Sequence, residues 1–93
     1  MQESYIENKV CEWAKKNGWL VRKLQWIGRE GAPDRLFLKA GRFVLIEFKR
    51  PGQKPRPSQR LEIKRLRQYG ATVAVIDNVE DGIAFLNDEY ATS

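Results

Sequence analysis

Three side chains able to do chemistry bracket one short stretch of the sequence, with Asp34 at its start and Glu47 and Lys49 at its end. Between them, two apolar runs are joined by Ala40-Gly41, a connection typical of a β-hairpin. If Ala40 and Gly41 are the central residues of a two-residue turn, Asp34 faces Glu47 directly. Side chains alternate between the two faces of a strand, so Lys49 is expected on the same face as Glu47.

Two carboxylates that face each other across a hairpin repel and destabilise it. A divalent cation bound between them removes this repulsion, and Lys49 adds a positive charge beside them, as a metal-dependent phosphodiesterase requires. A three-residue loop with Gly41 in the left-handed conformation would shift the register by one residue and leave the acids diagonal, still within reach of one ion. The alternative is a pair of solvated surface charges, but Glu47 ends the apolar run 43–46 and precedes Phe48, which favours an internal position.

Apolar periodicity predicts the elements that must hold this hairpin. Their order is helix, strand, strand, strand, helix, strand, helix, over residues 3–17, 19–27, the two arms of 34–49, 58–69, 71–76 and 79–87. A helix between the third and fourth strands implies one parallel pair in an otherwise antiparallel sheet. Both faces of the hairpin are apolar, so we expect it to be central and covered on both sides. Residues 88–93 are expected to fray.

The second helix is expected to begin at Ser58, whose side chain can serve as an N-cap. Leu61 and Tyr69 are expected among its inward or flanking positions. In the first helix, Glu3 and Glu7 lie one turn apart on the flank of the apolar stripe. Acidic residues are favoured in the first turn of a helix, and this accounts for Glu3, whereas the role of Glu7 stays open at this point.

The composition bounds the class of protein. The chain has 93 residues, which predicts a single domain over residues 1–93, and a net charge of +5, which favours a polyanionic partner such as nucleic acid. It contains no histidine, which excludes Ser-His and Cys-His machinery. The lone Cys11 forms no internal disulfide, and neither a membrane span nor a signal peptide is visible. We therefore expect a cytoplasmic protein.

A basic, proline-rich loop follows the hairpin over residues 50–57. Its three prolines exclude regular structure, and its charges suit the phosphate backbone of a nucleic acid. The alternative is a plain connector with solvated charges. The candidate DNA contacts, in this loop and elsewhere, are Arg29, Arg35, Arg50, Lys54, Arg56 and Arg60.

Two segments and a later glutamine resemble a known family: Gly31-Ala32-Pro33-Asp34-Arg35, then Glu47-Phe48-Lys49-Arg50-Pro51-Gly52, then Gln59. The Pro-Asp…Glu-x-Lys pattern is similar to the PD-(D/E)XK nucleases, and the fuller form resembles their VRR-NUC branch. Ala32 stands where many relatives carry Val. The resemblance covers essentially the whole chain, and it implies an α/β fold with a restriction-endonuclease-like α-β-β-β-α-β core, a mixed sheet flanked by helices.

The resemblance also implies a role for each site residue. Asp34 and Glu47 would bind the metal together with the backbone carbonyl of Phe48. Lys49 would orient or deprotonate the attacking water or act as an electrostatic clamp, and the sequence leaves these roles open. Glu7 would contact the metal through water. Gln59 would support Lys49 and the water.

Carboxylate and carbonyl oxygens select a hard ion, Mg²⁺ or Mn²⁺. Stand-alone chains of this size resemble Holliday-junction resolvases, which act as homodimers on branched DNA, in a bacterial or phage setting. The expected function is therefore a metal-dependent, structure-selective endodeoxyribonuclease with no small-molecule cofactor. The alternatives are a flap or general DNA endonuclease, which would take duplex DNA as well, and a non-catalytic DNA-binding subunit. A restriction enzyme would need base-reading elements for which 93 residues leave little room.

Overall fold

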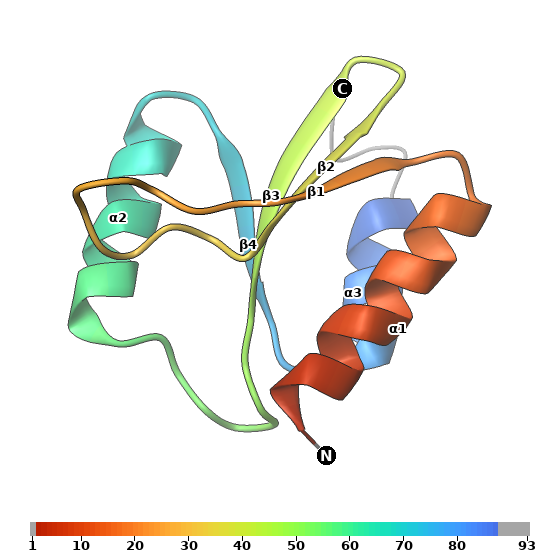
Figure 1. Cartoon of the computed structure of the whole chain (residues 1–93), viewed down its shortest axis with the longest axis horizontal. Coiled ribbons are helices and arrows are strands. Elements are labelled where there is room, and N and C mark those ends of the chain that lie inside the picture. Colours follow the sequence, from red (N-terminus) through yellow and green to blue (C-terminus); the bar gives the residue numbers. More distant parts are fainter. Residues whose placement is uncertain (1, 88–93) are drawn as a thin grey trace.

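A computed structural model describes residues 2–87 and arranges three helices around one four-stranded sheet (Figure 1). The elements are α1 (Glu3–Lys16), β1 (Leu20–Lys23), β2 (Arg35–Lys39), β3 (Arg42–Phe48), α2 (Pro57–Gln68), β4 (Thr72–Ile76) and α3 (Val79–Asn87). The strand order is β1-β2-β3-β4, with β3 and β4 parallel and the other neighbours antiparallel. The predicted element order and mixed sheet are confirmed, with α2 connecting the parallel strands.

The hairpin has the two-residue turn. Lys39 pairs with Arg42, and the two residues between them have positive φ, 50° at Ala40 and 80° at Gly41. This is the backbone of a type I′ turn, whose twist matches that of the strands it joins. The three-residue loop is therefore excluded, and the register of the two-residue turn holds as far as the pair Arg35 and Ile46. One residue further, the Asp34 N–H donates to the Ile46 carbonyl, at 3.0 Å.

Alternation along β2 and β3 divides the core into two layers. Figure 1 shows α1 and α3 beside each other on one side of the sheet and α2 on the other. The larger cluster includes Phe37, Val44, Ile46 and Phe48 from the hairpin, under α1 and α3. Burial of one such side chain contributes about 1.5–3 kcal/mol. Both central strands are therefore covered, as expected, although not along their whole length.

The smaller layer lies under α2 and consists of Leu45, Ile63 and Val73 with partly buried neighbours. Phe43, near the hairpin turn, extends beyond this layer and is half exposed. On the opposite side, α1 and α3 approach closely at Gly82, where a Cβ atom would lie 2.6 Å from Val10 Cγ2. Only glycine permits this separation of the two helices.

The strand expected over residues 19–27 is wrong in its length, because β1 ends at Lys23. Leu24 still donates its N–H to the Asp34 carbonyl, at 3.0 Å, but the chain then leaves the sheet. Pro33 has no N–H to offer a longer strand. Residues 24–34 therefore form a loop that Figure 1 shows running out to α2 and back.

The expected start of α2 is also wrong, since Arg56 is its N-cap residue and Ser58 lies inside the first turn. Leu61 and Tyr69 were expected among the inward or flanking positions, yet they are 48% and 92% exposed. The buried face of α2 instead carries Gln59, Glu62 and Ile63. Polar residues occupy this face because they bind other segments, which hydrophobic periodicity does not reveal.

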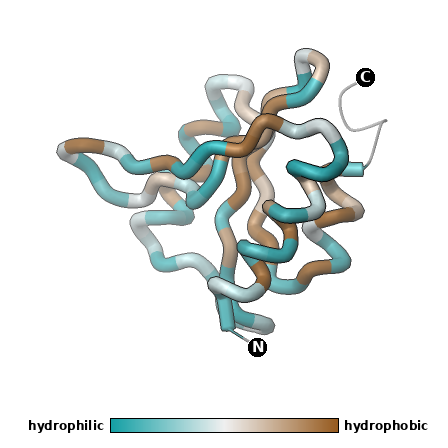
Figure 2. The backbone as a smooth tube through the Cα atoms, turned by 45° about the vertical axis from the view of Figure 1, so that its right-hand side comes forward, coloured by the Kyte–Doolittle hydropathy of each residue, from teal (hydrophilic) through white to brown (hydrophobic). Residues whose placement is uncertain are grey.

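Figure 2 shows hydrophobic segments concentrated along the strands, with hydrophilic segments on the outer turns of the helices. Among residues 2–87, none of the helices combines the length and the apolarity needed to cross a membrane. The segment 88–93, expected to fray, lies outside the described residues.

Candidate active site

The site lies where β3 ends and the loop after it begins. Side chains alternate along β3, so Glu47 lies on the same face as Phe43 and Leu45, which is the α2 side of the sheet. Glu47 also lies beside the parallel strand β4. Glu47 is 1% exposed and Lys49 7% exposed. A hollow of about 400 Å³ opens over them, lined by Glu3, Asp34, Glu47, Lys49, Gln53, Lys54, Arg56 and Gln59. The fold thus brings residues from four separate segments to one point.

Glu47 has one occupied and one unoccupied carboxylate oxygen. Its Oε2 accepts hydrogen bonds from Gln59 Nε2, at 2.7 Å, and from Lys49 Nζ, at 3.1 Å. Its Oε1 is buried and has no hydrogen-bond partner within the described residues. A buried carboxylate oxygen without a partner is costly, so this atom indicates a place where a cation or a bound water belongs.

Gln59 uses both ends of its amide. Its Oε1 accepts the N–H of Arg56, at 3.0 Å, while its Nε2 donates to Glu47. The first bond satisfies an otherwise unpaired donor at the start of α2. The second bond goes to Glu47, whereas the family resemblance implied that Gln59 supports Lys49. The Gln59 side chain therefore helps to cap the first turn of α2 and also fixes the Glu47 carboxylate.

Asp34 faces the hollow from the position directly before β2. Its Oδ2 accepts the Phe48 N–H at 2.7 Å, which holds the carboxylate against the end of β3. Burial raises the pKa of Asp34, and the Phe48 N–H opposes part of this rise. Burial and the charge of Asp34 raise the pKa of Glu47 to about 7, although Lys49 acts in the opposite direction. The two acids cannot both ionise cheaply without an added positive charge.

The donor set fits a hard divalent cation. Glu47 Oε1 is buried and without a partner among the described residues, and Asp34 lines the same hollow, where its Oδ2 accepts the Phe48 N–H. No three acidic, histidine or cysteine side chains within residues 2–87 cluster closely enough to hold an ion by themselves. Carbonyl oxygen, water or substrate phosphate would therefore complete the shell, which is usual for Mg²⁺.

Of the two acids on the flank of the first helix, Glu3 lines the hollow, and Glu7 lines an adjoining one with Arg50. Glu7 forms an ion pair with Arg35, at 2.6 Å between Oε2 and Nε, and does not line the hollow. Arg35 points to the α1 side of the sheet, opposite to Asp34, because side chains alternate along β2. Glu3, one turn earlier, lies beyond the end of the sheet and lines the hollow. The metal contact assigned to Glu7 stays a prediction.

Sequence reasoning assigned Glu3 to helix-start electrostatics. The one feature of the sequence that could have indicated Glu3 as a site residue is its four-residue spacing from Glu7, which puts both on the same flank of α1. Which of the two reaches the hollow depends on how far α1 extends past the sheet. That distance is a tertiary property.

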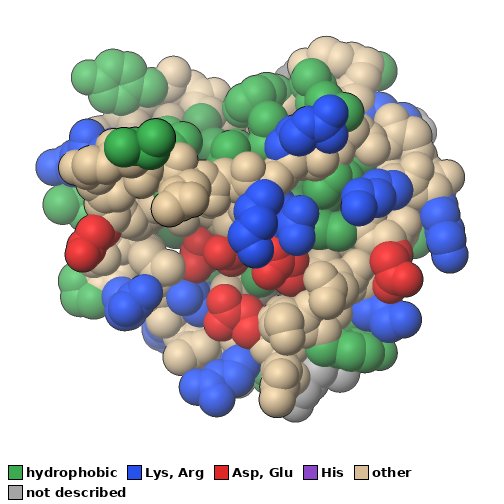
Figure 3. Space-filling view, in the orientation of Figure 1, with side chains coloured by type: hydrophobic (Ala, Val, Ile, Leu, Met, Phe, Trp, Pro, Cys, Tyr) green, Lys and Arg blue, Asp and Glu red, His purple; other side chains and the backbone are tan. Residues whose placement is uncertain are grey.

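The six candidate DNA contacts separate into two groups. Lys54 and Arg56 line the hollow, and Arg50 lies on its border, in the adjoining hollows. The other three are committed elsewhere: Arg29 lies 3.9 Å from Glu62, Arg35 pairs with Glu7, and Arg60 donates to the Pro55 carbonyl. Figure 3 shows acidic side chains gathered near the centre of one face, with Lys and Arg side chains around them.

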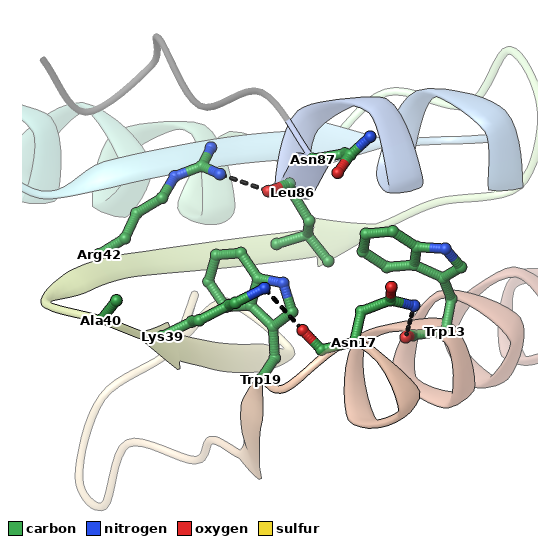
Figure 4. Close-up of a pocket in the computed structure, with 8 residues that line it drawn as sticks. All are labelled: Trp13, Asn17, Trp19, Lys39, Ala40, Arg42, Leu86 and Asn87. Carbon is green, nitrogen blue, oxygen red and sulfur yellow. Dashed lines mark hydrogen bonds between the residues drawn. The ribbon is translucent and has the colours of Figure 1, made fainter.

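A second hollow lies at the opposite end of the hairpin, among α1, α3 and the turn (Figure 4). Its cations already have partners at helix ends: Lys39 Nζ donates to the Asn17 carbonyl, at 2.7 Å, and Arg42 donates to the carbonyls of Phe85 and Leu86. Cations stabilise helix C-termini, so a structural role accounts for them.

A mixed sheet that carries the half-buried Asp34 and the buried Glu47 and Lys49 at the end of a central hairpin defines a nuclease-type α/β fold. A solved structure described as "VRR_NUC domain" superimposes with a TM-score of 0.85, at 34% identity, over 95% of this chain and 97% of that one. None of the protein-family models compared with the chain matches it.

A curated protein from Acyrthosiphon pisum secondary endosymbiont phage 1, named "Putative nuclease p44", is 38% identical over 79 residues. The match covers 84% of this chain and 85% of that protein. The chain belongs to the VRR-NUC family of nucleases. The family resemblance and the fold class inferred from the motifs are thereby confirmed.

Proposed function

We propose that the chain is a metal-dependent, structure-selective endodeoxyribonuclease that acts on branched DNA as a homodimer, in the manner of a Holliday-junction resolvase. The observation that carries the proposal is the buried Glu47, with one oxygen unpaired and Lys49 Nζ 3.1 Å from the other. A domain that only binds DNA gains nothing from an acidic group whose charge is this costly. A hydrolytic site that recruits a cation does gain from it.

In this proposal Asp34, Glu47 and the Phe48 carbonyl hold Mg²⁺ or Mn²⁺. The ion, when bound, makes a water more acidic and neutralises charge on the scissile phosphate. Gln59 keeps Glu47 from turning away from the site. Glu3 accepts a hydrogen bond from a water in the hollow.

Lys49 has its ammonium beside the carboxylates and within a nearly enclosed position. There it stabilises the charge that develops on the phosphate and orients the attacking water. Lys54, Arg56 and Arg50 then bind the flanking phosphates of the same strand, because they border the hollow from the 50–56 loop.

A homodimer would place two such hollows on two strands of a junction. The chain mass is 10.8 kDa, so light scattering on the free protein should give twice this value. A monomeric mass would remove the resolvase form of the proposal and leave a flap or general DNA endonuclease.

The decisive experiment is a cleavage gel with Mg²⁺ or Mn²⁺ on four-way junctions, flaps and plain duplex. Asp34→Ala and Glu47→Gln should lower the rate at least a thousandfold, since each removes a proposed ligand. Glu12→Gln is the matched control, because Glu12 is exposed on α1 and pairs only with Lys9. Undiminished cleavage by Glu47→Gln would refute the site, and tight binding without any cleavage would favour a DNA-binding subunit.

A further inference from the structure

The loop between β1 and β2 presents an apolar side chain that the fold does not use. Ile27, at its tip, is 97% exposed, the highest value among the exposed large hydrophobic residues described. Figure 2 shows a hydrophobic stretch near the outer end of the loop that projects from the sheet. Burying an apolar side chain stabilises a structure, and the folded chain leaves this gain unused at Ile27.

The loop is nevertheless held firmly. The Trp26 indole donates to Glu62 Oε2 at 2.6 Å, and Glu62, on α2, is only 7% exposed. Arg29 approaches the other oxygen of Glu62 at 3.9 Å. Gly31 packs so tightly that a Cβ atom would lie 2.8 Å from the Ser58 carbonyl oxygen. Ile27 is therefore an exposed apolar group on a braced loop.

The loop also borders the candidate active site. Its returning arm, residues 30–32, lines a hollow of about 300 Å³ together with Arg56, Ser58 and Gln59. Two of these residues, Arg56 and Gln59, line the active-site hollow as well. A nucleic acid strand that entered the site between Lys54 and Arg56 would therefore have this loop beside its path.

We propose that the β1–β2 loop recognises substrate shape, with Ile27 packing against an unstacked nucleobase where paired DNA is interrupted. This inference rests on the proposed nuclease function. Isoleucine is among the apolar wedges that proteins insert at distorted base steps. A protein partner fits less well, since a stable interface buries about 800 Å² on each side, and Ile27 is a single side chain on a loop that also carries Arg29 and Glu30.

Glu62 is the positioning residue in this arrangement. It lies one turn along α2 from Gln59, which binds Glu47, so one helix sets both the catalytic carboxylate and the recognition loop. Loss of the Glu62 carboxylate would release Trp26 and let the loop move away from the site. Glu62→Gln keeps an oxygen for the indole N–H, whereas Glu62→Ala does not.

The test compares Ile27→Ser with Ile27→Leu on a four-way junction and on the same sequence fully paired. For Ile27→Ser we expect the ratio of junction to duplex cleavage rates to fall about tenfold, the loss that corresponds to one small apolar contact. Ile27→Leu should keep the ratio. Folding should be unaffected, because Ile27 contributes almost no buried surface.

Tyr69→Ser is the matched control. Tyr69 is 92% exposed but lies ten residues along the helix from Gln59, about 15 Å away. It should leave the ratio unchanged. Glu62→Ala should reproduce the loss seen with Ile27→Ser, and Glu62→Gln should not.

A second readout places 2-aminopurine at the branch point and measures its fluorescence with Ca²⁺ in place of Mg²⁺. Wild-type protein should raise the fluorescence by unstacking the base, and Ile27→Ser should lose at least half of the rise. An unchanged ratio and an unchanged fluorescence with Ile27→Ser would overturn the inference, as would equal losses on junction and duplex or a changed oligomeric mass. If the wild type cleaves no DNA, the proposed function fails, and the fluorescence difference alone decides whether Ile27 contacts the base.

Discussion

Glu47 shows how the surroundings of one residue prepare it for a partner. Burial and the facing Asp34 oppose its negative charge, while Gln59 and Lys49 bind one of its oxygens and orient the other toward the hollow. The carboxylate is already fixed in the folded chain, so ordering it would cost little if it bound the proposed ion. The same fixing makes the empty site electrostatically strained.

This strain predicts a pH dependence of stability. The pKa of Glu47 is about 7 in the folded chain against an ordinary 4.5, so the folded state holds the proton more tightly. Its stabilising contribution is complete below about 4.5 and is lost as the pH rises to about 7, on the order of 3 kcal/mol. Thermal unfolding in EDTA should therefore show a falling Tm across this window.

Glu47→Gln is the control for this effect, since an amide has no proton to lose. The Tm of this variant should fall less between pH 4.5 and pH 7, and its Tm at pH 8 should exceed that of the wild type. Mg²⁺ should raise the Tm of the wild type at pH 8 and leave that of the variant nearly unchanged. Equal slopes for the two proteins would show that Glu47 is not the strained group.

Glu3 and Glu7 predict opposite phenotypes. Glu3→Gln should lower the cleavage rate about tenfold with little effect on stability, because Glu3 lines the hollow and forms no ion pair within residues 2–87. Glu7→Gln should lower stability by about 1–2 kcal/mol, because it weakens a half-buried pair with Arg35. Cleavage gels and urea unfolding of the two variants measure both quantities. If Glu7→Gln instead lowered the cleavage rate and Glu3→Gln lowered the stability, the metal contact would belong to Glu7.

At the scale of elements, the hairpin and α2 meet to form the site. The type I′ turn sets the register that brings Asp34 to Glu47, and the first turn of α2 delivers Gln59. Neither element has to be rigid on its own, because each is covered by a hydrophobic layer. The catalytic geometry therefore depends on the register of the hairpin and on where α2 begins.

The turn carries a removable strain. Ala40 has a φ of 50°, a region that costs an L-residue about 1 kcal/mol and costs glycine nothing. Ala40→Gly should therefore raise the free energy of unfolding by up to about 1 kcal/mol in urea titrations, with unchanged cleavage. Ala40→Val, at the same place, should lower it. A destabilised Ala40→Gly would mean that the Ala40 methyl group contributes packing that outweighs the strain.

At the scale of the whole molecule, the net charge of +5 coexists with an acidic centre. The acids lie in the floor of the hollow, and the cations of the 50–56 loop stand at its border. In the proposed function, the border attracts phosphates and the centre holds the cation. The positive surface charge and the negative charge of the site therefore attract ions of opposite sign.

This arrangement predicts a salt dependence of DNA binding. The logarithm of the binding constant falls linearly with the logarithm of the salt concentration. For Lys54→Ala and for Arg50→Ala, the magnitude of this slope should decrease by about 1, because each variant releases one fewer counterion on binding. Lys16→Ala, at the far end of α1, should leave the slope unchanged. Fluorescence anisotropy with Ca²⁺ measures this slope, and an unchanged slope for both loop variants would remove the loop from the binding surface.

Much of the fold and part of the site could be predicted from local rules. Alternating apolar residues and the Ala40-Gly41 connection predict the hairpin, its register and the facing acids, because turn geometry and period-two alternation act over a few residues. The limits of β1 could not be predicted in this way. Trp26 lies beyond the end of β1 because its indole N–H donates to Glu62, which is 36 positions later in the chain.

The sequence by itself determined that Asp34, Glu47 and Lys49 lie together, since their spacing along one hairpin already brings them to one end of it. Only the tertiary structure decided which acid of α1 reaches the hollow, that Gln59 binds Glu47, and that Ile27 is left exposed on a braced loop. These outcomes depend on how far α1 passes the end of the sheet and on where α2 packs. Such distances arise from packing between elements remote in the chain, and no local pattern records them.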